Sequence, residues 1–328
     1  MKIIRRPRRS RKSDVIRALL EETKLSLEDF IFPLFLKDGD GTKEAVPSMP
    51  GVYRHTVASL LKEIEECILL GVKNFCLFPF IDDTLKDQFA SESYNPESIY
   101  LKTVRKIKTH FPEAYLMTDV AMDAYSSDGH DGVYQKEAIL NDETLPILGK
   151  MALAQAQAGT DIIGPSDMMD GRIGYIREVL DKEGFKEVLI MAYTAKYASA
   201  LYEPFREALG STPKKIDKKT YQMNPANRRE ALVEATLDIQ EGAGVLMVKP
   251  AICYLDVIKA LKDCYNLPVA AYNASGEYVM IKAAAQNGWL DEKEVMLESL
   301  ISIKRAGADI ILSYFTKEYA KLLNKSNF

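Results

Sequence analysis

The sequence predicts an α/β fold, a (β/α)8 TIM barrel with an extended N-terminal arm. Short apolar runs alternate along the chain with amphipathic helical stretches, and we find eight such runs. The runs are apolar throughout rather than at every second position, which is typical of parallel strands covered on both faces. Eight strands alternating with helices over roughly 300 residues favour a closed barrel over an open doubly wound sheet. No Gly-x-Gly-x-x-Gly motif follows the first run, which counts against a dinucleotide-binding fold.

The individual elements follow from the same pattern. A helical stretch ends near a glycine that fits the stop position, as at Gly71 and Gly159, and a short apolar strand comes next. We expect residues 1–28 to form an arm that makes oligomer contacts and residues 29–328 to form the barrel. In order, the expected elements are strand 30–36, helix 60–70, strand 74–79, strand 115–122, helix 145–158, strand 161–164, helix 171–183, strand 188–193, helix 229–241, strand 244–249, helix 254–265, strand 269–272, helix 292–305 and strand 309–314.

Composition and charge narrow the range of partners. The net charge of −4 creates no field that would recruit nucleic acid. No apolar run approaches the ~20 residues that span a bilayer, and the N-terminus lacks the apolar core of a secretory signal. We therefore expect a cytoplasmic protein that binds neither nucleic acid nor membrane. The basic cluster at residues 5–12 fits a solvated arm or one docked on another subunit.

The cysteines and histidines argue against a zinc centre. The four cysteines form no Cys-x-x-Cys pair, so a zinc ribbon or a thioredoxin-like motif is not supported. The three histidines are too scattered in sequence to form a histidine metal cluster. These counts favour a reducing compartment.

Two lysines occupy positions that require an explanation. Lys196 lies just past the fifth expected strand, and Lys249 ends the sixth. Burial disfavours the charged ammonium, and a neutral amine is a nucleophile that forms Schiff bases with carbonyl compounds. For each lysine considered alone, the alternative interpretation is that its side chain extends to solvent beyond the end of its strand. Adjacent barrel strands nevertheless place both at the rim where the catalytic groups of such barrels lie.

Other polar side chains are expected at the same rim. The loop at residues 119–132 holds four carboxylates and one imidazole, and such oxygen-rich loops suit magnesium rather than a thiolate zinc site. The alternative is a solvated loop of turn-forming residues. The polar residues at the remaining strand ends are Ser166 and Asp167 at the end of the fourth strand, Ser275 at the end of the seventh and Tyr314 at the end of the eighth.

A long basic connection follows the fifth strand. Residues 196–229 suit a flap, and Arg206 is able to bind a carboxylate through two hydrogen bonds. Lys214 and Lys215 fit a solvated charge run. Two function classes remain open from these residues alone: a lysine-dependent lyase or aldolase acting on a small acidic carbonyl compound, and a barrel that binds phosphate or carboxylate ligands without covalent chemistry. A pyridoxal phosphate enzyme is a weaker third class, because no convincing phosphate-binding glycine loop is present.

Four segments carry a resemblance to a known family. They are Met-Val-Lys-Pro-Ala at 247–251, Ala-Lys-Tyr-Ala-Ser at 195–199, Pro-Ser-Asp-Met-Met-Asp-Gly-Arg at 165–172 and Tyr-Asn-Ala-Ser-Gly-Glu-Tyr at 272–278. With them the chain, from about residue 5 to its C-terminus, resembles the porphobilinogen synthase family, also called delta-aminolevulinic acid dehydratase. The resemblance implies a hydro-lyase of tetrapyrrole (heme and chlorophyll) biosynthesis. Such an enzyme condenses two 5-aminolevulinate molecules to porphobilinogen with loss of two waters, through a lysine Schiff base.

The resemblance also assigns roles to residues. Lys249 matches the lysine that forms the Schiff base with the A-side substrate, and Lys196 matches the second lysine, which holds the P-side substrate. At the Lys218 position the family usually has arginine, and lysine keeps the charge but loses the planar fork. The other substrate-binding candidates are Ser275 and Tyr314 for the A-side carboxylate, Arg206, Lys218 and Gln222 for the other carboxylate, and Asp119, Asp123, Ser166, Tyr202 and Phe205.

The resemblance bears on metals as well. The zinc-using branch has cysteines at the positions of Ala121, Asp123 and Asp131, so this chain resembles the aspartate-rich branch and no catalytic thiolate zinc is expected. Ala124 and Asp128 also depart from the usual proline and histidine. The cofactor expected is Mg²⁺, bound by Glu234 at an allosteric interface site, with Asp123 and Asp131 as candidate ligands of an active-site ion. For Glu234 the alternative is a solvated helix face.

The resemblance further implies an assembly and a mechanism. Family members are typically homo-octamers whose N-terminal arms embrace a neighbouring barrel. In the expected reaction the neutral amine of Lys249 attacks one substrate ketone, while the nearby cation of Lys196 helps to keep Lys249 deprotonated. The flap excludes water. Asp119 and Asp123 recognise the free amino group of the substrate or relay protons.

Overall fold

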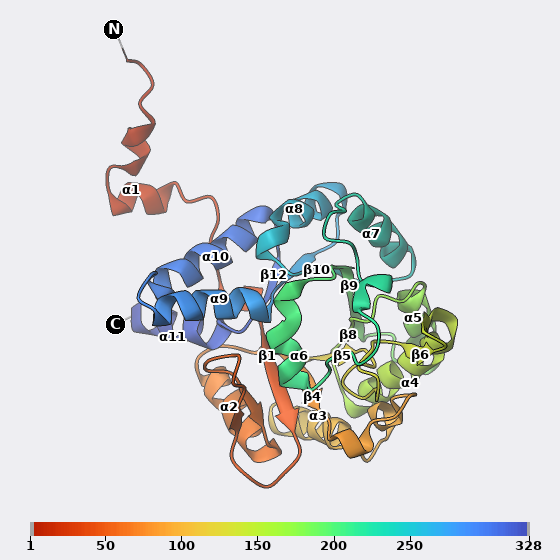
Figure 1. The fold of residues 1–328 in the computed structure, drawn as a ribbon. Coiled ribbons are helices and arrows are strands. Elements are labelled where there is room, and N and C mark those ends of the chain that lie inside the picture. Colours follow the sequence, from red (N-terminus) through yellow and green to blue (C-terminus); the bar gives the residue numbers. More distant parts are fainter. Residues whose placement is uncertain (1–2, 327–328) are drawn as a thin grey trace.

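The computed structural model describes residues 3–326, and within them eight parallel strands close into a barrel (Figure 1). Strands that follow one another along the chain are neighbours in the barrel. The last barrel strand pairs with the first through Ile311 and Phe30. The predicted TIM barrel is therefore confirmed. The barrel strands are β1 (Phe30–Lys37), β4 (Asn74–Phe80), β5 (Tyr115–Val120), β8 (Ile162–Pro165), β9 (Leu189–Lys196), β10 (Val245–Lys249), β11 (Val269–Asn273) and β12 (Ile310–Ser313).

Helices form the outer layer of the barrel. Each helix expected from periodicity is present, with ends shifted by a few residues. Gly159 and Gly307 end α4 and α10 with φ values of 100° and 119°, in the left-handed region that favours glycine. The helices around the barrel are α2 (Val57–Leu69), α3 (Ile99–His110), α4 (Asn141–Ala158), α5 (Arg172–Lys182), α7 (Glu230–Gln240), α8 (Leu255–Cys264), α9 (Ser275–Gln286), α10 (Glu292–Ala306) and α11 (Thr316–Ser326).

Shorter elements lie before and between the barrel strands. The sequence patterns did not single them out, because two- and three-residue strands carry too few side chains for a period. They are the antiparallel pairs β2 (Glu44–Ala45) with β3 (Tyr53–His55) and β6 (Val133–Gln135) with β7 (Ala138–Leu140), the helix α6 (Glu203–Leu209), and the 3-10 turns Leu27–Asp29, Asp83–Leu85, Ser91–Tyr94, Ala200–Tyr202, Lys218–Thr220 and Ile252–Tyr254. Viewed along the barrel, α6 overlaps the opening of the ring of strands (Figure 1).

Aromatic side chains pack together at the carboxyl ends of the strands. Phe78 lies 5.8 Å from Phe35 and 6.5 Å from Tyr272, measured between ring centroids. Tyr272 lies 6.5 Å from Tyr193 and 6.2 Å from Tyr314. All five rings are buried. The cluster therefore gives this end of the barrel an apolar, low-dielectric interior.

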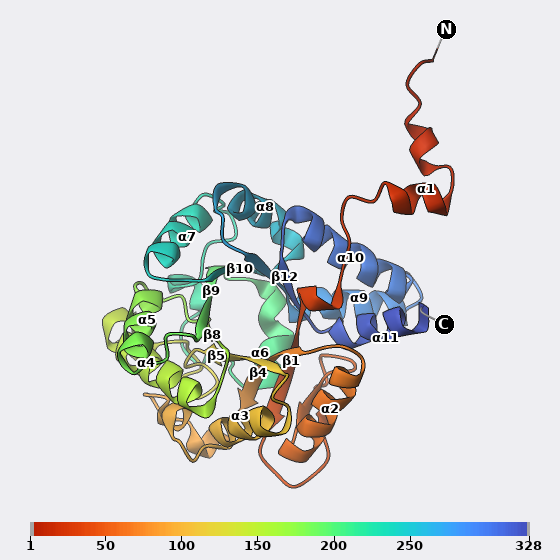
Figure 2. The same ribbon diagram turned by 180° about the vertical axis from the view of Figure 1, so that it is seen from behind.

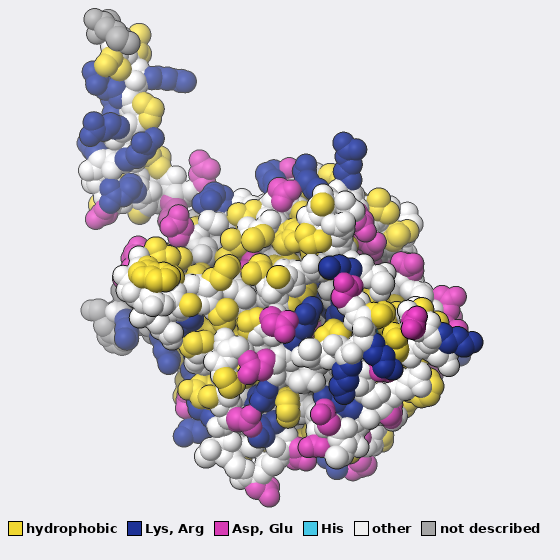
Figure 3. All heavy atoms as spheres, in the orientation of Figure 1, with side chains coloured by type: hydrophobic (Ala, Val, Ile, Leu, Met, Phe, Trp, Pro, Cys, Tyr) yellow, Lys and Arg dark blue, Asp and Glu magenta, His cyan; other side chains and the backbone are white. Residues whose placement is uncertain are grey.

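The N-terminal arm extends away from the barrel in both ribbon views (Figures 1 and 2). It contains a 3-10 turn (Pro7–Arg11) and α1 (Asp14–Leu19), and basic side chains gather along it (Figure 3). The apolar residues Val15 and Leu19 are 78% and 75% exposed. The role of residues 1–28 in oligomer contacts stays a prediction. Within the described residues, no helix combines the length and apolarity needed to cross a bilayer.

Candidate active site

Lys196 and Lys249 are paired neighbours at the ends of β9 and β10. The parallel register places Lys249 opposite Lys196. Strand β9 continues through Lys196, whereas the sequence pattern ended it at residue 193. Residues 194–196 are small or polar, so they carry no apolar signal, although the structure buries all three. The two lysines are 6% and 4% exposed. The alternative that either extends to solvent is therefore wrong.

The ammonium group of Lys249 lies among aromatic rings. Its Nζ atom is 4.3 Å from the Tyr272 ring centroid, 4.5 Å from that of Phe205, 5.2 Å from that of Tyr202 and 5.3 Å from that of Tyr193. Burial, with the charge of Lys196 second, lowers the pKa of Lys249 to about 7. A large fraction of this amine is therefore neutral and nucleophilic near neutral pH.

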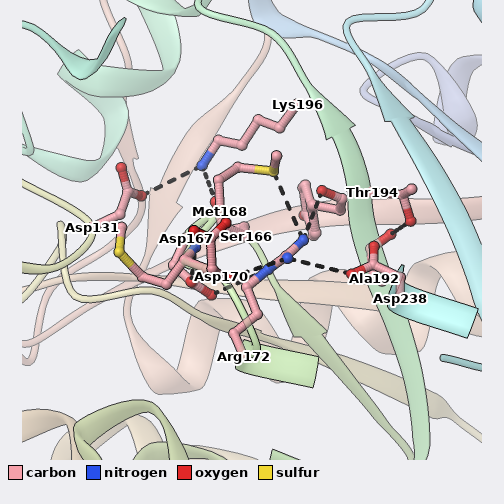
Figure 4. Close-up of polar contacts among 12 residues, drawn as sticks. Asp131, Ser166, Asp167, Met168, Asp170, Arg172, Ala192, Thr194, Lys196 and Asp238 are labelled. Atoms are coloured by element: carbon pink, nitrogen blue, oxygen red, sulfur yellow. Dashed lines mark hydrogen bonds and ion pairs between the residues drawn. The ribbon is translucent and has the colours of Figure 1, made fainter. Parts of the chain in front are cut away.

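The ammonium group of Lys196 instead has polar partners. Its Nζ atom donates to the carbonyl oxygen of Ser166 and lies 3.4 Å from Asp131 Oδ1 (Figure 4). Both partners of this ammonium group are oxygen atoms. The two lysines thus differ in their surroundings: Lys249 lies against rings and loses its proton readily, and Lys196 keeps oxygen ligands.

A buried arginine supports the segment that receives Lys196. Arg172 extends beneath residues 166–170 and is 2% exposed (Figure 4). Its Nη1 atom donates to Asp238 Oδ1 at 3.3 Å and its Nη2 atom to the Tyr193 carbonyl oxygen at 3.2 Å. Asp167 accepts from the Met169 amide at 2.7 Å, so it shapes this loop rather than facing the lysines.

The carboxylates of the Asp-rich loop divide into two environments. Burial raises the pKa of Asp119 to about 7, against the opposing effect of Lys196. Asp123 Oδ2 and Asp131 Oδ2 instead lie 3.0 and 2.9 Å from Lys218 Nζ. Burial acts to raise the pKa of Asp131, but Lys196 and Lys218 hold it well below its ordinary value. Asp119 therefore exchanges a proton near neutral pH, and Asp131 stays ionised.

The pair Asp123 and Asp131 does not fit a divalent cation in this arrangement, because the Lys218 ammonium lies between their oxygens. Burial opposes the charge on Lys218, but the two carboxylates raise the pKa of this lysine overall. Among the described residues, no group of three or more His, Cys, Asp and Glu side chains is arranged to hold a metal ion. Lys218 therefore supplies the positive charge between Asp123 and Asp131.

Glu234 lies in a different environment, away from the two lysines. It lies on α7 and lines a cavity of about 450 Å³ together with Glu137, Asp170 and Glu230. Burial raises the pKa of Glu234 to about 7, with Arg172 acting in the opposite direction and Asp238 adding to the rise. Asp170 and Glu230 also act to raise this pKa, so negative charge gathers around the cavity. The alternative of a solvated helix face does not describe this half-buried side chain.

Ten of the residues expected at the site line one small cavity of about 20 Å³, about the space that one water occupies. Ser275 and Tyr314 are not among them. Ser275 Oγ accepts from the Phe205 amide at 3.1 Å, and the Tyr314 hydroxyl lies 3.1 Å from that of Tyr272. The residues lining the cavity are Asp119, Asp123, Ser166, Lys196, Tyr202, Phe205, Arg206, Lys218, Gln222 and Lys249.

Sequence reasoning missed Tyr193 and Tyr272, whose rings face Lys249. A sequence signal existed for the second, because Tyr272 ends the expected strand that follows the strand ended by Lys249. The structure pairs Val248 with Ala271, which places Tyr272 level with Lys249. The contacts of Arg172 carried no such signal, because they depend on how distant segments meet.

Comparisons with known proteins point to one family. A family model described as delta-aminolevulinic acid dehydratase matches residues 4–322. The delta-aminolevulinic acid dehydratase of Chlamydia pneumoniae is 52% identical over 321 residues, covering 98% of this chain and 97% of the relative. That of Bradyrhizobium diazoefficiens is 51% identical over 319 residues, covering 97% of this chain and 90% of the relative. The chloroplastic enzyme of Physcomitrium patens is 53% identical over 323 residues, covering 97% and 74%.

A solved structure is similar over the whole chain. The crystal structure of delta-aminolevulinic acid dehydratase (porphobilinogen synthase) from Toxoplasma gondii ME49, in complex with the reaction product porphobilinogen, superposes with a TM-score of 0.96. The two sequences are 48% identical, and the match covers 98% of this chain and 92% of that one.

Proposed function

Because this chain belongs to the delta-aminolevulinic acid dehydratase family, it is a hydro-lyase of tetrapyrrole biosynthesis, and we propose that Lys249 carries its reaction through a Schiff base. The reaction condenses two molecules of 5-aminolevulinate to porphobilinogen with loss of two waters. The non-covalent binding barrel and the pyridoxal phosphate enzyme are set aside by this membership. The observation that carries the proposal is the buried amine of Lys249, whose pKa is lowered to about 7.

The first covalent step uses this amine. The nitrogen of Lys249 bonds to the ketone carbon of one 5-aminolevulinate, and both protons of the amine pass to the ketone oxygen, which leaves as water. Asp119 supports these transfers, because its pKa, raised to about 7 by burial, lets it take up and release a proton near neutral pH. The rings around Lys249 keep bulk water from the imine.

Lys196 holds the second substrate in this proposal. Its charge lowers the pKa of Lys249, so it acts on the first step before any contact of its own with a ketone. Arg206, Lys218 and Gln222 supply cationic and amide donors for one substrate carboxylate. Ser275 and Tyr314 serve the other once α6 moves, since Ser275 Oγ contacts the Phe205 amide in this conformation.

Asp123 receives the free ammonium group of a substrate in the same scheme. Lys218 Nζ already occupies this carboxylate at 3.0 Å. An incoming substrate ammonium replaces one cation with another, and the released Lys218 turns to the substrate carboxylate. The exchange keeps every buried charge paired, which avoids the cost of an unpartnered ion.

We propose further that magnesium binds at the Glu234 cavity and not at Asp123 and Asp131. The support is the set of mutually repelling carboxylates there, in contrast to the pair already bridged by Lys218. When bound, the ion neutralises this acidic cavity. It takes no part in the chemical steps at Lys249.

The magnesium proposal predicts a response that depends on one side chain. Chelator-treated enzyme is expected to gain about fivefold or more in activity when Mg²⁺ is restored, a typical size for coupling between sites. Glu234→Gln is expected to lose this response and to lose Mg²⁺ binding by isothermal titration calorimetry. Glu178→Gln is the control, because Glu178 lies on α5 outside this cavity. Rescue by zinc alone would contradict the proposal.

We also propose that the chain forms a homo-octamer through its arm. The support is the exposed apolar face of the arm, Val15 and Leu19, next to its basic cluster. Deletion of residues 1–24 is expected to reduce the particle to a smaller assembly, measured by light scattering after size-exclusion chromatography. An unchanged mass would show that the arm is not the contact.

The four unpaired cysteines of the described chain support a reducing compartment, and we propose the cytoplasm.

A further inference from the structure

The helix α6 covers Lys249 and has to move before a substrate can enter. Phe205 on α6 places its ring centroid 4.5 Å from Lys249 Nζ, and that ring also packs edge-on against Phe78 at 5.0 Å. The cavity beneath holds about 20 Å³. A substrate with a carboxylate, a ketone and an amine does not fit this space, so the structure shows the site with its cover closed.

Both ends of α6 are tied to the barrel. Near its N-terminal end, Ser275 Oγ accepts from the Phe205 amide at 3.1 Å and donates to the Leu201 carbonyl oxygen at 3.2 Å. The C-terminal end is held by two cations from other parts of the rim. Arg54 Nε donates to the Ala208 carbonyl oxygen at 2.8 Å, and Arg54 Nη2 donates to that of Glu207.

The second cation is Lys86. Its Nζ atom donates to the Gly210 carbonyl oxygen at 2.8 Å, directly after the end of α6. Carbonyl oxygens in the last turn of a helix lack intrahelical partners and carry partial negative charge. Two cations at this end therefore stabilise the helix and fasten it to the rim at the same time.

The guanidinium of Arg54 is itself fixed in place. It is 8% exposed, its Nη1 atom donates to Glu44 Oε1 at 2.6 Å, and its carbon lies 4.2 Å from the Phe80 ring centroid. Every nitrogen of the group has a protein partner. Binding two consecutive carbonyls with Nε and Nη2 requires a planar fork, which lysine lacks.

We propose that Arg54 is a positioning residue for the condensation, a latch that holds α6 closed over Lys249. Opening the site requires breaking its two bonds to Glu207 and Ala208, which lie 153 and 154 positions away in the sequence. Glu44 fixes the orientation of the Arg54 guanidinium. Lys86 holds the same end of α6 through the Gly210 carbonyl oxygen. The kinetic consequence rests on the proposed role of Lys249, whereas the contact itself is a property of the free protein.

Hydrogen–deuterium exchange of the whole protein tests the latch without reference to activity. In Arg54→Gln, amides of residues 203–210 are expected to exchange about tenfold faster, because two charge-assisted hydrogen bonds are lost. The KM for 5-aminolevulinate is expected to rise more than kcat falls, since closure over the substrate becomes less favourable. Arg54→Lys is expected to recover part of the effect through its charge.

Arg177→Gln is the matched control. Arg177 also donates to two backbone carbonyls, those of Val188 and Phe185, and pairs with Asp181, but it lies on α5 away from α6. Exchange at residues 203–210 that equals the control, or a uniform rise across the barrel with a matching fall in Tm, would overturn the latch. Faster exchange at 203–210 without a Schiff base at Lys249 would instead leave the latch standing and remove the proposed chemistry.

Discussion

Replacing Lys249 with alanine is expected to lower kcat by about 10⁴-fold or more while leaving the barrel folded, because the reaction then lacks its nucleophile. In the unmodified enzyme, borohydride reduction in the presence of 5-aminolevulinate is expected to attach the substrate irreversibly to the peptide that contains residue 249. Peptide mass mapping locates this adduct. The expectation rests on the burial of the amine and on its pKa of about 7.

Lys282 provides a control inside the same molecule. It is 8% exposed, and its Nζ atom lies 5.3 and 5.5 Å from the ring centroids of Tyr278 and Phe315. It pairs with Glu292 and Glu318 at 2.6 Å, however, and these partners outweigh burial and raise its pKa. Lys282 is therefore expected to carry no adduct. Full activity in Lys249→Ala, or an adduct at Lys282 instead, would refute the covalent assignment.

Removing Lys196 is expected to have the second largest effect. In Lys196→Gln the rate is expected to fall about a thousandfold, as is typical when a preorganised charge is lost from an active site. The more specific result concerns pH. Imine formation at Lys249 requires the neutral amine, so trapping is expected to increase with pH through a midpoint near 7 and then level off.

The direction of the change in Lys196→Gln follows from charge. The Lys196 cation disfavours a second cation on Lys249, so its removal raises the pKa of Lys249 and moves the midpoint upward by about one pH unit. Lys215→Gln is the control, because Lys215 is a flap lysine whose side chain is 55% exposed beside Asp128. A midpoint that stays at 7 in Lys196→Gln would show that burial alone sets the pKa of Lys249.

The two lysines have similar sequence contexts but different chemical surroundings. Both end apolar strands, and the register places them opposite each other. The difference lies in what approaches them: Asp131 and the Ser166 carbonyl reach Lys196, whereas Phe205 and Tyr272 reach Lys249. Lys196 thus has oxygen partners for its ammonium group, whereas burial favours the neutral form of Lys249.

Much of the fold was predictable because its signals are local. Continuous apolar runs identified the eight strands, and glycines at helix ends set the boundaries, as at Gly159 and Gly307. The helix α9 was not identified from its sequence, since it buries polar residues such as Ser275, Glu277 and Lys282 and so lacks a clear apolar stripe. The sequence pattern likewise ended β9 too early, because Lys196 is polar. The last residue pair between β9 and β10, Lys196 with Lys249, was therefore not predicted.

The sequence by itself determined which residue types stand at the strand ends, since covalent order and the cost of burying polar groups are both local. From this came the barrel, the lysines Lys196 and Lys249 and the Asp-rich loop after β5. Only the tertiary structure decided which charges meet. Lys218 bridges Asp123 and Asp131 across 95 positions in one case and 87 in the other, and Arg54 reaches α6 across more than 150. Interaction between buried charges depends on distance and on the surrounding dielectric, and both arise only when the barrel closes.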